Sequence, residues 1–480
     1  MPGADPEAQM PEYVTPATAP ASGPISLRSS WAALSVLFVI YFFHSLDRTI
    51  LGILSQPIKE ELGLTDWQLG LMSGLAFTLL YITFGFPMAR LADRGNRTLI
   101  LSACVLVWSA MTALCGFAAN FIQLCLFRAG VGVGEAGCLP ASHSLISDLF
   151  PPQTRAVALS IFGLALPIGG LVGATLGGFV MDQWGWRTAF VIAGLPGIAV
   201  AFLTFAMVKE PIRGRFDRMA TQESAPSGRP SFKDVATALW KSPVSRNVLI
   251  ALTLGGFIGA PNVVFMGPYM IRKFGLGYTE LGAIIALTFM LGSAISTIGG
   301  GLLIHWASKF DQRWSMWVPA IGVAISTPLY ITSYAQPTWM GLAALMFVAS
   351  IINSTYLAPS FAALHSVVAP SGRATASVIA QGSLALLGAS LGPLAGGLAI
   401  DLLAGHLFER ASSGTFLTSC PGGRAVAGAS GTLDAICRAS VVDATQIVLI
   451  FFLAFTVLPA WFFYRAARGM KPGPFGAIDT

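Results

Sequence analysis

The chain has 480 residues, of which 54% are hydrophobic and only 10% are charged. About a quarter of the residues in a soluble domain are charged, so this composition excludes an ordinary soluble protein and indicates a membrane protein. The net charge of +6 is no sign of nucleic-acid binding, because most basic residues lie in the breaks between apolar segments. The 52 glycines suit helices that pack closely in lipid.

Residues 1–29 are polar and rich in Pro and Ala, which predicts a disordered cytoplasmic tail and no cleavable signal peptide. Twelve apolar segments of membrane-spanning length follow. Lys and Arg are concentrated on the side that would hold both termini, so we expect a multi-pass protein of the cell inner membrane with both termini in the cytoplasm. The segments cover 30–57, 66–92, 98–118, 120–149, 154–181, 187–208, 246–272, 279–307, 314–335, 339–367, 373–403 and 441–466.

The longest internal break, 209–245, separates six segments from six and is rich in Lys, Arg, Pro and Ser. Within it, Ser231 could cap a short helix on the membrane surface. We therefore predict an all-α membrane protein with twelve transmembrane helices in two six-helix bundles. The expected parts are a first bundle over 30–208, a cytoplasmic linker over 209–245, a second bundle over 246–467 with a long outer loop at 404–440, and a cytoplasmic tail over 468–480.

The two bundles look like repeats. Arg155-Ala156 opens the fifth segment and Arg373-Ala374 opens the eleventh. The fifth closes with Gly177–Asp182 and the eleventh with Gly396–Asp401, at an offset of about 219 residues. Two parallel six-helix repeats, related by an axis along the membrane normal, are a known transporter architecture.

Two of the six cysteines, Cys420 and Cys437, lie in the predicted outer loop. An oxidising compartment such as the bacterial periplasm would join them, although spacing alone leaves the pairing open. The other cysteines fall in or at the ends of apolar segments, where small core residues are expected.

Four ionisable residues lie deep inside apolar segments, away from the segment ends: Asp47, Arg48, Arg128 and Glu135. A charge at the bilayer centre costs about 2.5–3.5 kcal/mol on insertion scales, so each must face a partner or water within the bundle. Arg128 and Glu135 are seven residues apart, which places them on one face of a helix, about 10 Å apart along its axis.

The stretch Ala89–Arg97 follows the second segment and resembles the G-x-L-x-D-R-x-x-R signature of the major facilitator superfamily, with Ala89 in place of the first Gly. The resemblance implies that Asp93, Arg94 and Arg97 bridge neighbouring helix ends on the cytoplasmic face. The counterpart in the second half is degenerate.

Within that superfamily the first half resembles the Spinster branch. The resemblance rests on Leu46-Asp47-Arg48, Gly132–Ala136, Ser147–Phe150 and Thr154-Arg155. Spinster-like proteins are thought to move lysophospholipids and sphingoid phosphates, with proton coupling in at least some members. The resemblance therefore implies a secondary transporter, with protons as the coupling ion and no other cofactor.

Asp47 and Arg128 lie at similar depths in the membrane, and in a twelve-helix transporter fold both segments line the central cavity. We predict that Asp47 pairs with Arg128, with Glu135 about two turns deeper, and that these three residues couple transport to protons. If the helices separate, a buried Asp47 without its arginine would bind a proton. A purely structural clamp is the alternative. His44, one turn before Asp47, could tune it.

The first half carries the charges, and the second offers mainly apolar and small residues, so the expected cargo is amphipathic. Arginines in the cavity would suit an anionic head group. We expect contacts with membrane lipid and an amphipathic small-molecule substrate, no nucleic acid, and a monomer. The substrate-cavity candidates are Arg48, His44, Asn262, Asn353, Tyr356 and Gln381.

Two other functions stay open. The cargo could be a small organic anion or sugar acid, or the chain could be a transporter-like membrane sensor without flux. An enzyme is not expected, because the sequence has no metal cluster, phosphate loop or nucleophile elbow. The absence of G-x-x-x-x-G-K-[ST] excludes an ATP-driven pump.

Overall fold

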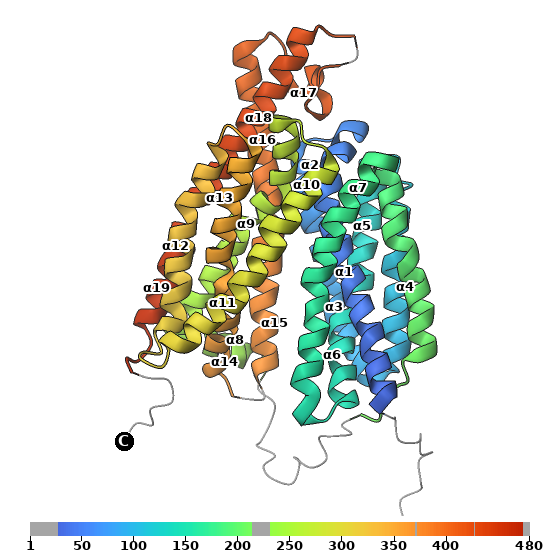
Figure 1. Cartoon of the computed structure of the whole chain (residues 1–480), viewed down its shortest axis with the longest axis vertical. Helices are drawn as coiled ribbons and strands as arrows, with labels where there is room; N and C mark the ends of the chain where they lie inside the picture. The colour runs from blue at the N-terminus through green and yellow to red at the C-terminus, as the bar shows by residue number, and fades with distance from the viewer. Residues whose placement is uncertain (1–26, 214–230, 370–371, 427, 474–480) are drawn as a thin grey trace, which may run out of the picture.

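The computed structural model describes residues 27–213, 231–369, 372–426 and 428–473 (Figure 1). Every regular element in these ranges is helical, which confirms the all-α membrane class. Most of the predicted tail 1–29 lies outside the described residues, but residues 27–29 already belong to the first helix. The first half contains α1 (Leu27–Leu62), α2 (Asp66–Gly70), a π-helical turn (Leu71–Leu75), α3 (Ala76–Arg94), α4 (Arg97–Cys115), α5 (Phe121–Glu135), α6 (Cys138–Leu149) and α7 (Pro152–Met207).

Helix α7 contains two membrane crossings. Its apolar part, Val157–Met207, has 51 residues; at 1.5 Å per residue it is about 77 Å long, more than twice the thickness of a bilayer core. Gly185 turns the chain between the crossings with a φ of 79°, which glycine adopts without strain. Within the described residues, eleven helical stretches are long and apolar enough to span a membrane, and α7 accounts for two of the twelve predicted segments.

The predicted surface helix is α8 (Phe232–Lys241). The Ser231 hydroxyl accepts a hydrogen bond from the Asp234 N–H at 3.2 Å, and the hydrogen bonds from Ser231 lower the pKa of Asp234. Residues 214–230 of the linker lie outside the described ranges.

The second half contains α9 (Pro243–Phe274), α10 (Tyr278–Ile285), a π-helical turn (Ala286–Leu291), α11 (Gly292–Ala307), α12 (Trp314–Tyr334), α13 (Trp339–Asn353), a 3₁₀ turn (Ser354–Tyr356), α14 (Leu357–Ser366), α15 (Arg373–Gly382), a second π-helical stretch (Ser383–Ser390), α16 (Leu391–Ala411), α17 (Phe416–Ser419), a 3₁₀ turn (Pro421–Gly423), α18 (Gly431–Ala454) and α19 (Val457–Arg468).

The outer loop predicted at 404–440 is shorter than expected. Helix α16 continues to Ala411 and α18 begins at Gly431, so the connection covers only 412–430. The last turns of α16 carry His406, Glu409 and Arg410, which keep the helix but end its apolar pattern. Hydropathy therefore marks where the helix leaves the lipid, not where the helix stops.

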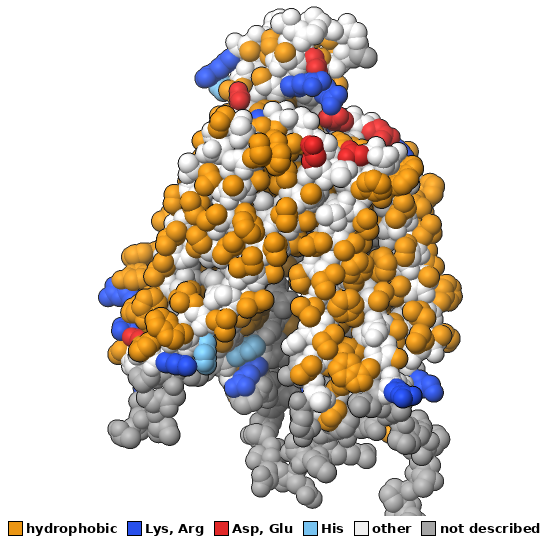
Figure 2. All heavy atoms as spheres, viewed as in Figure 1, with side chains coloured by type: hydrophobic (Ala, Val, Ile, Leu, Met, Phe, Trp, Pro, Cys, Tyr) orange, Lys and Arg blue, Asp and Glu red, His pale blue; other side chains and the backbone are white. Residues whose placement is uncertain are grey.

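The two ends of the bundle differ (Figure 1). We call the end that carries α17 the disulfide end; there α2 packs on α16 and α7 packs on α10, in both cases across the two halves. At the opposite end, the ribbons of α6 and α15 stand apart. Hydrophobic side chains cover the middle of the visible face and charged ones gather toward both ends (Figure 2), as expected for a bundle surrounded by lipid.

Candidate functional site

Helix α5 carries the stretch that holds Arg128 and Glu135, and its glycines set how closely it packs. A Cβ on Gly132 would lie 2.5 Å from the Phe77 carbonyl oxygen of α3. A Cβ on Gly134 would lie 2.5 Å from the backbone nitrogen of Trp108 in α4. Since no larger residue fits at either position, the two glycines let α5 pack closely against both α3 and α4. This close packing places the Arg128 and Glu135 side chains inside the bundle.

The structure brings Asp47 and Arg128 together. Arg128 Nη1 donates to Asp47 Oδ2 at 2.9 Å. The Thr112 hydroxyl donates to Asp47 Oδ1 at 2.8 Å, so both carboxylate oxygens have a partner. Each charged residue is only 2% exposed. Removing either partner of such a pair would leave an uncompensated charge inside the protein.

Glu135 forms a second cluster with Arg48 and His44. Arg48 Nε donates to Glu135 Oε2 at 3.1 Å, and His44 Nδ1 lies 3.4 Å from the same oxygen. Glu135 Oε1 has no hydrogen-bond partner among the described residues, although Glu135 is fully buried. The sequence suggested His44 as a modulator of Asp47, whereas the structure places it beside Glu135.

Arg48 is the exposed member of this cluster, with 44% of its side chain accessible. Its guanidinium carbon lies 4.6 Å from the Phe77 ring centroid and 5.3 Å from that of Tyr81. Cation–π contacts with the two rings stabilise the guanidinium, and part of the Arg48 side chain stays accessible to solvent. Arg48 can therefore contact Glu135 and a further anion from one position.

Glu135 is also the last residue of α5. The fourth segment, predicted over 120–149, is one spanning stretch, Phe121–Leu149, but its α-helical hydrogen bonding breaks at Ala136-Gly137 before α6 begins at Cys138. The hydrophobic pattern continues across the break, so it gives no warning of it.

The polar candidates of the second half surround a separate cavity of about 360 Å³. Asn262, Asn353 and Tyr356 line it. Asn262 Oδ1 accepts from the Tyr334 hydroxyl at 2.7 Å, whereas Asn262 Nδ2 has no partner among the described residues. Gln381 is exposed on α15 and is not part of this lining. Other polar residues also line the cavity, and no pattern in the sequence distinguishes them from ordinary core residues: Ser293, Ser326, Tyr330, Ser350 and Thr456.

The six residues proposed for one substrate cavity thus divide into two groups. Arg48 and His44 belong to the charged cluster of the first half, and three of the other four belong to the cavity of the second. The cavity lining includes Phe289, Leu384 and Phe463 beside its amides and hydroxyls. It can accept both hydrogen-bonding and apolar groups.

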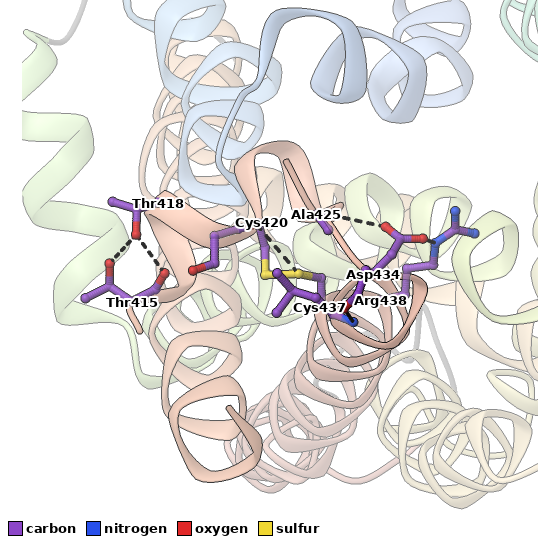
Figure 3. The surroundings of a disulfide bond; sticks show 10 residues. Thr415, Thr418, Cys420, Ala425, Asp434, Cys437 and Arg438 are labelled. Atoms are coloured by element: carbon purple, nitrogen blue, oxygen red, sulfur yellow. Dashed lines mark hydrogen bonds and ion pairs between the residues drawn. A yellow bond between two sulfur atoms is a disulfide. The ribbon is translucent and has the colours of Figure 1, made fainter. Parts of the chain in front are cut away.

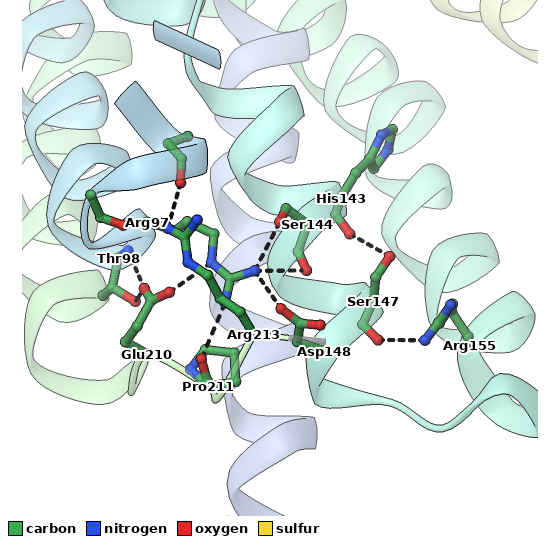
Figure 4. Close-up of polar contacts among 12 residues, drawn as sticks. Arg97, Thr98, His143, Ser144, Ser147, Asp148, Arg155, Glu210, Pro211 and Arg213 are labelled. Carbon is green, nitrogen blue, oxygen red and sulfur yellow. Dashed lines mark hydrogen bonds and ion pairs between the residues drawn. The ribbon is translucent and has the colours of Figure 1, made fainter. Parts of the chain in front are cut away.

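Arg97 joins three parts of the first half at the end opposite the disulfide (Figure 4). Its guanidinium donates to Asp148 Oδ2 of α6 at 2.5 Å and to Glu210 Oε1, beyond α7, at 2.6 Å. Arg97 is 2% exposed. The side chains of Asp93 and Arg94, the other signature residues, lie outside the described ones.

A disulfide joins Cys420, after α17, to Cys437 of α18 (Figure 3). The closed loop also contacts the first half: Arg424 Nη2 lies 2.9 Å from Glu60 Oε2 of α1. A Cβ on Gly422 would lie 3.2 Å from the Lys59 carbonyl oxygen. This loop of the second half therefore covers the end of α1.

The paired acids and arginines of a two-halved helical membrane protein point to a transporter. Residues 37–393 match the model of the Major Facilitator Superfamily, and the chain belongs to that superfamily. Within it the chain is Spinster-like: its fold matches a bacterial homologue of the human lysosomal transporter Spinster, solved in an inward-facing and occupied conformation, with a TM-score of 0.81 and 29% identity over 93% of this chain and 98% of that one. It is a transporter and not an enzyme.

The relatives of this chain differ in what they are described as transporting. The chain is 30% identical to an MFS-type efflux pump of Mycolicibacterium smegmatis, over 80% of this chain and 87% of the pump. It is 28% identical to the sphingosine-1-phosphate transporter SPNS2 of Danio rerio, over 82% of each chain. It is also 26% identical to a probable L-galactonate transporter of Escherichia coli, over 59% of this chain and 63% of that protein.

Proposed function

We propose that the protein is a proton-coupled secondary transporter for an amphipathic, anionic, lipid-like solute of the lysophospholipid or sphingoid type. It would work by alternating access in the cell inner membrane, as a monomer with both termini in the cytoplasm. The observation that carries this proposal is the contact between buried Glu135 and exposed Arg48, 3.1 Å apart. Among the described residues, Arg48 is the one cation of fixed charge that contacts the Glu135 carboxylate, and its side chain remains open to a ligand.

This contact suggests how the cargo and the proton are linked. An anionic head group that binds Arg48 competes with Glu135 for the same guanidinium. An ionised carboxylate without a partner is costly inside the bundle, so Glu135 would bind a proton when Arg48 turns to the cargo. Asp47 keeps two partners, Arg128 and Thr112. Asp47 would lose these partners only if α1 moved away from α4 and α5.

The lipid-like nature of the cargo is supported by three observations. Arg48 offers an anion-binding group, and the cavity of the second half mixes amides and hydroxyls with apolar side chains. The similarity to SPNS2 covers 82% of both chains. An anionic head with an apolar tail matches this distribution of charge and apolar surface.

The test is uptake of labelled lysophospholipid into proteoliposomes under an imposed proton gradient. Wild type is compared with Asp47→Asn, Glu135→Gln and, as a matched control, Glu409→Gln, whose side chain is exposed at the end of α16. We expect gradient-driven uptake in the wild type and the control. In Glu135→Gln, uptake should become independent of the gradient while exchange of labelled for unlabelled cargo continues.

The outcomes separate the parts of the proposal. Uptake that depends on the gradient in Glu135→Gln but not in Asp47→Asn would move the coupling site to Asp47. Gradient dependence in both variants would rule out either residue as the coupling site. No lysophospholipid uptake by correctly oriented wild-type protein would overturn the lipid cargo.

A small sugar acid or organic anion is the second candidate cargo. It is favoured by the similarity to the probable L-galactonate transporter and by Asn262 Nδ2, which has no hydrogen-bond partner among the described residues and lies in the wall of the 360 Å³ cavity. A hydroxyl-rich anion could satisfy that amide and Arg48 together. Uptake of labelled galactonate in the same proteoliposomes, with no lysophospholipid uptake, would establish this alternative.

A further inference from the structure

Two carboxylates at the disulfide end cap helices of the opposite half. Asp401, in the middle of α16, accepts hydrogen bonds from the backbone N–H groups of Asp66 at 2.9 Å and Trp67 at 2.7 Å. These are the first residues of α2. The first N–H groups of a helix have no partner within the helix, so a carboxylate from outside fills that need and also suits the helix dipole.

Asp182 of α7 makes the same contact with α10. It accepts from the N–H groups of Tyr278 at 3.1 Å and Thr279 at 2.7 Å, and from the Thr279 hydroxyl at 2.6 Å. Tyr278 and Thr279 are the first residues of α10. Each half thus supplies one capping aspartate and one capped helix.

A glycine four residues before each aspartate allows the contact. A Cβ on Gly397 would lie 2.2 Å from the Asp66 carbonyl oxygen, and one on Gly178 would lie 2.1 Å from the Tyr278 carbonyl oxygen. Residues four apart lie on one face of a helix. The motif Gly-x-x-x-Asp therefore presents a flat backbone surface and a capping group to one helix start.

The match extends one turn further into the membrane. A Cβ on Gly70 of α2 would lie 2.2 Å from the Pro393 carbonyl oxygen. A Cβ on Gly282 of α10 would lie 2.2 Å from the Ala174 carbonyl oxygen. Pro393 and Ala174 are 219 positions apart, the offset that also relates Asp401 to Asp182. The two contacts are copies that follow the internal repeat.

We propose that these two copies of Gly-x-x-x-Asp are the matched pair of docking contacts that hold the disulfide end closed, with Asp182 and Asp401 as their positioning residues. The proposal rests on the alternating access of the proposed function, because a transporter must open this end and therefore break both contacts. Neither aspartate needs to touch the cargo or the coupling proton.

The two contacts have different surroundings. At the Asp401 contact, the Asp66 side chain is itself held by Lys59 at 2.5 Å and Arg272 at 2.9 Å; Asp66 and Lys59 are buried and Arg272 is partly buried. The backbone N–H bonds of Asp182 lie in an exposed setting. Water competes better for the exposed contact, so the α7–α10 side should open more readily than the α16–α2 side.

The test is hydrogen–deuterium exchange of the purified full chain in nanodiscs, followed at the backbone amides 66–70 and 278–282. Asp401→Ala should speed exchange on the order of tenfold at 66–70 and leave 278–282 unchanged, and Asp182→Ala should do the reverse. The double variant should speed exchange at both sites and along the facing surfaces of α7 and α16. In the wild type, 278–282 should exchange faster than 66–70.

Two further variants separate the cap from the charge and from general damage. Asp→Asn at either position keeps an acceptor oxygen and should retain most of the protection. Gly178→Ala should speed exchange at 278–282 although Asp182 is intact, whereas Gly301→Ala is the control because a Cβ there meets nothing within 4 Å. Asp434→Ala is the second control, since Asp434 contacts Ala425 and Arg438 of its own half.

Equal exchange in wild type and both alanine variants would overturn the proposal, as would an equal effect from Asp434→Ala. A single variant that opens both sites together would overturn the claim that there are two separate contacts. The readout needs no cargo, so a protein that fails to transport lysophospholipid still reports on these contacts. Intact contacts without transport would count against the proposed function alone.

Discussion

Arg48 Nε lies 3.1 Å from Glu135 Oε2 and connects an accessible guanidinium to a carboxylate that is fully buried. This contact, unlike the pair of Asp47 and Arg128, has one member within reach of a ligand. The first half therefore has two different ion pairs. Asp47 and Arg128 are both buried, whereas Arg48 can contact a ligand as well as Glu135.

Replacing Arg48 should weaken binding of an anionic cargo. In Arg48→Gln the charge-assisted bond to the head group is lost, and KM for lysophospholipid should rise about tenfold or more. Arg48→Lys should recover part of the loss, because it restores the charge but not the planar group between the rings and Glu135. Initial rates of uptake against cargo concentration measure the effect. An unchanged KM in Arg48→Gln would remove Arg48 from the binding site.

Breaking the buried pair should destabilise the first half. Arg128→Gln leaves Asp47 charged and largely dehydrated, at a cost of about 3–5 kcal/mol in the free energy of unfolding. The double variant Asp47→Asn with Arg128→Gln should be more stable than Arg128→Gln alone, because it leaves no charge behind. Thermal unfolding of the purified protein, with exposed Arg410→Gln as control, measures both. Additive losses would show that the two residues do not interact energetically.

The cavity of the second half should distinguish cargoes by their hydrogen bonding. Asn262→Leu removes the unpaired amide N–H₂ group and should lower uptake of a sugar acid about tenfold or more, since a site built for hydrogen bonds loses them. It should change lysophospholipid uptake much less if the tail occupies this cavity. Competition between the two labelled cargoes measures the difference. Equal losses for both would place the head group of the lipid at Asn262.

The bond between Cys420 and Cys437 should contribute more to stability than the nearby ion pair. It closes 17 residues, and loops of this size are stabilised by about 2–4 kcal/mol. The side chains of Arg424 and Glu60 are 52% and 24% exposed, and exposed pairs contribute about 0–1 kcal/mol. Replacing both cysteines by Ser should therefore lower the unfolding temperature clearly, and Glu60→Gln only slightly. The reverse order would contradict this ranking.

The sequence predicted the contact between Asp47 and Arg128, but not the one between Arg48 and Glu135. Asp47 and Arg128 stood out because neither can face lipid, and their similar depths placed them together. The position of His44 was open to the same argument. The chain rises along α1 and descends along α5, so a residue before Asp47 lies beside a residue after Arg128, which is Glu135.

Other features leave no pattern in the side chains. The break after Glu135 and the π-helical turns leave the apolar period unchanged, and a short hydropathy window cannot detect them. The repeat of Gly177–Asp182 at Gly396–Asp401 was recognised in the sequence, but the sequence did not predict that its aspartates cap helices of the opposite half. The groups that Asp182 and Asp401 bind are backbone N–H groups, which every helix start provides.

The order of synthesis also matters for the disulfide loop, because residues 412–430 are translated after eleven of the twelve crossings, whereas the residues they contact, Lys59 and Glu60, belong to the first crossing. The end of α1 must therefore wait through nearly the whole of synthesis before its cover exists. Until Cys437 has followed Cys420 out of the translocation machinery, the loop cannot be closed covalently. Covalent closure of this end of the molecule therefore comes late in biogenesis, and a cell that slows thiol oxidation would accumulate fully inserted chains in which only non-covalent contacts, such as Arg424 with Glu60, hold the loop on α1.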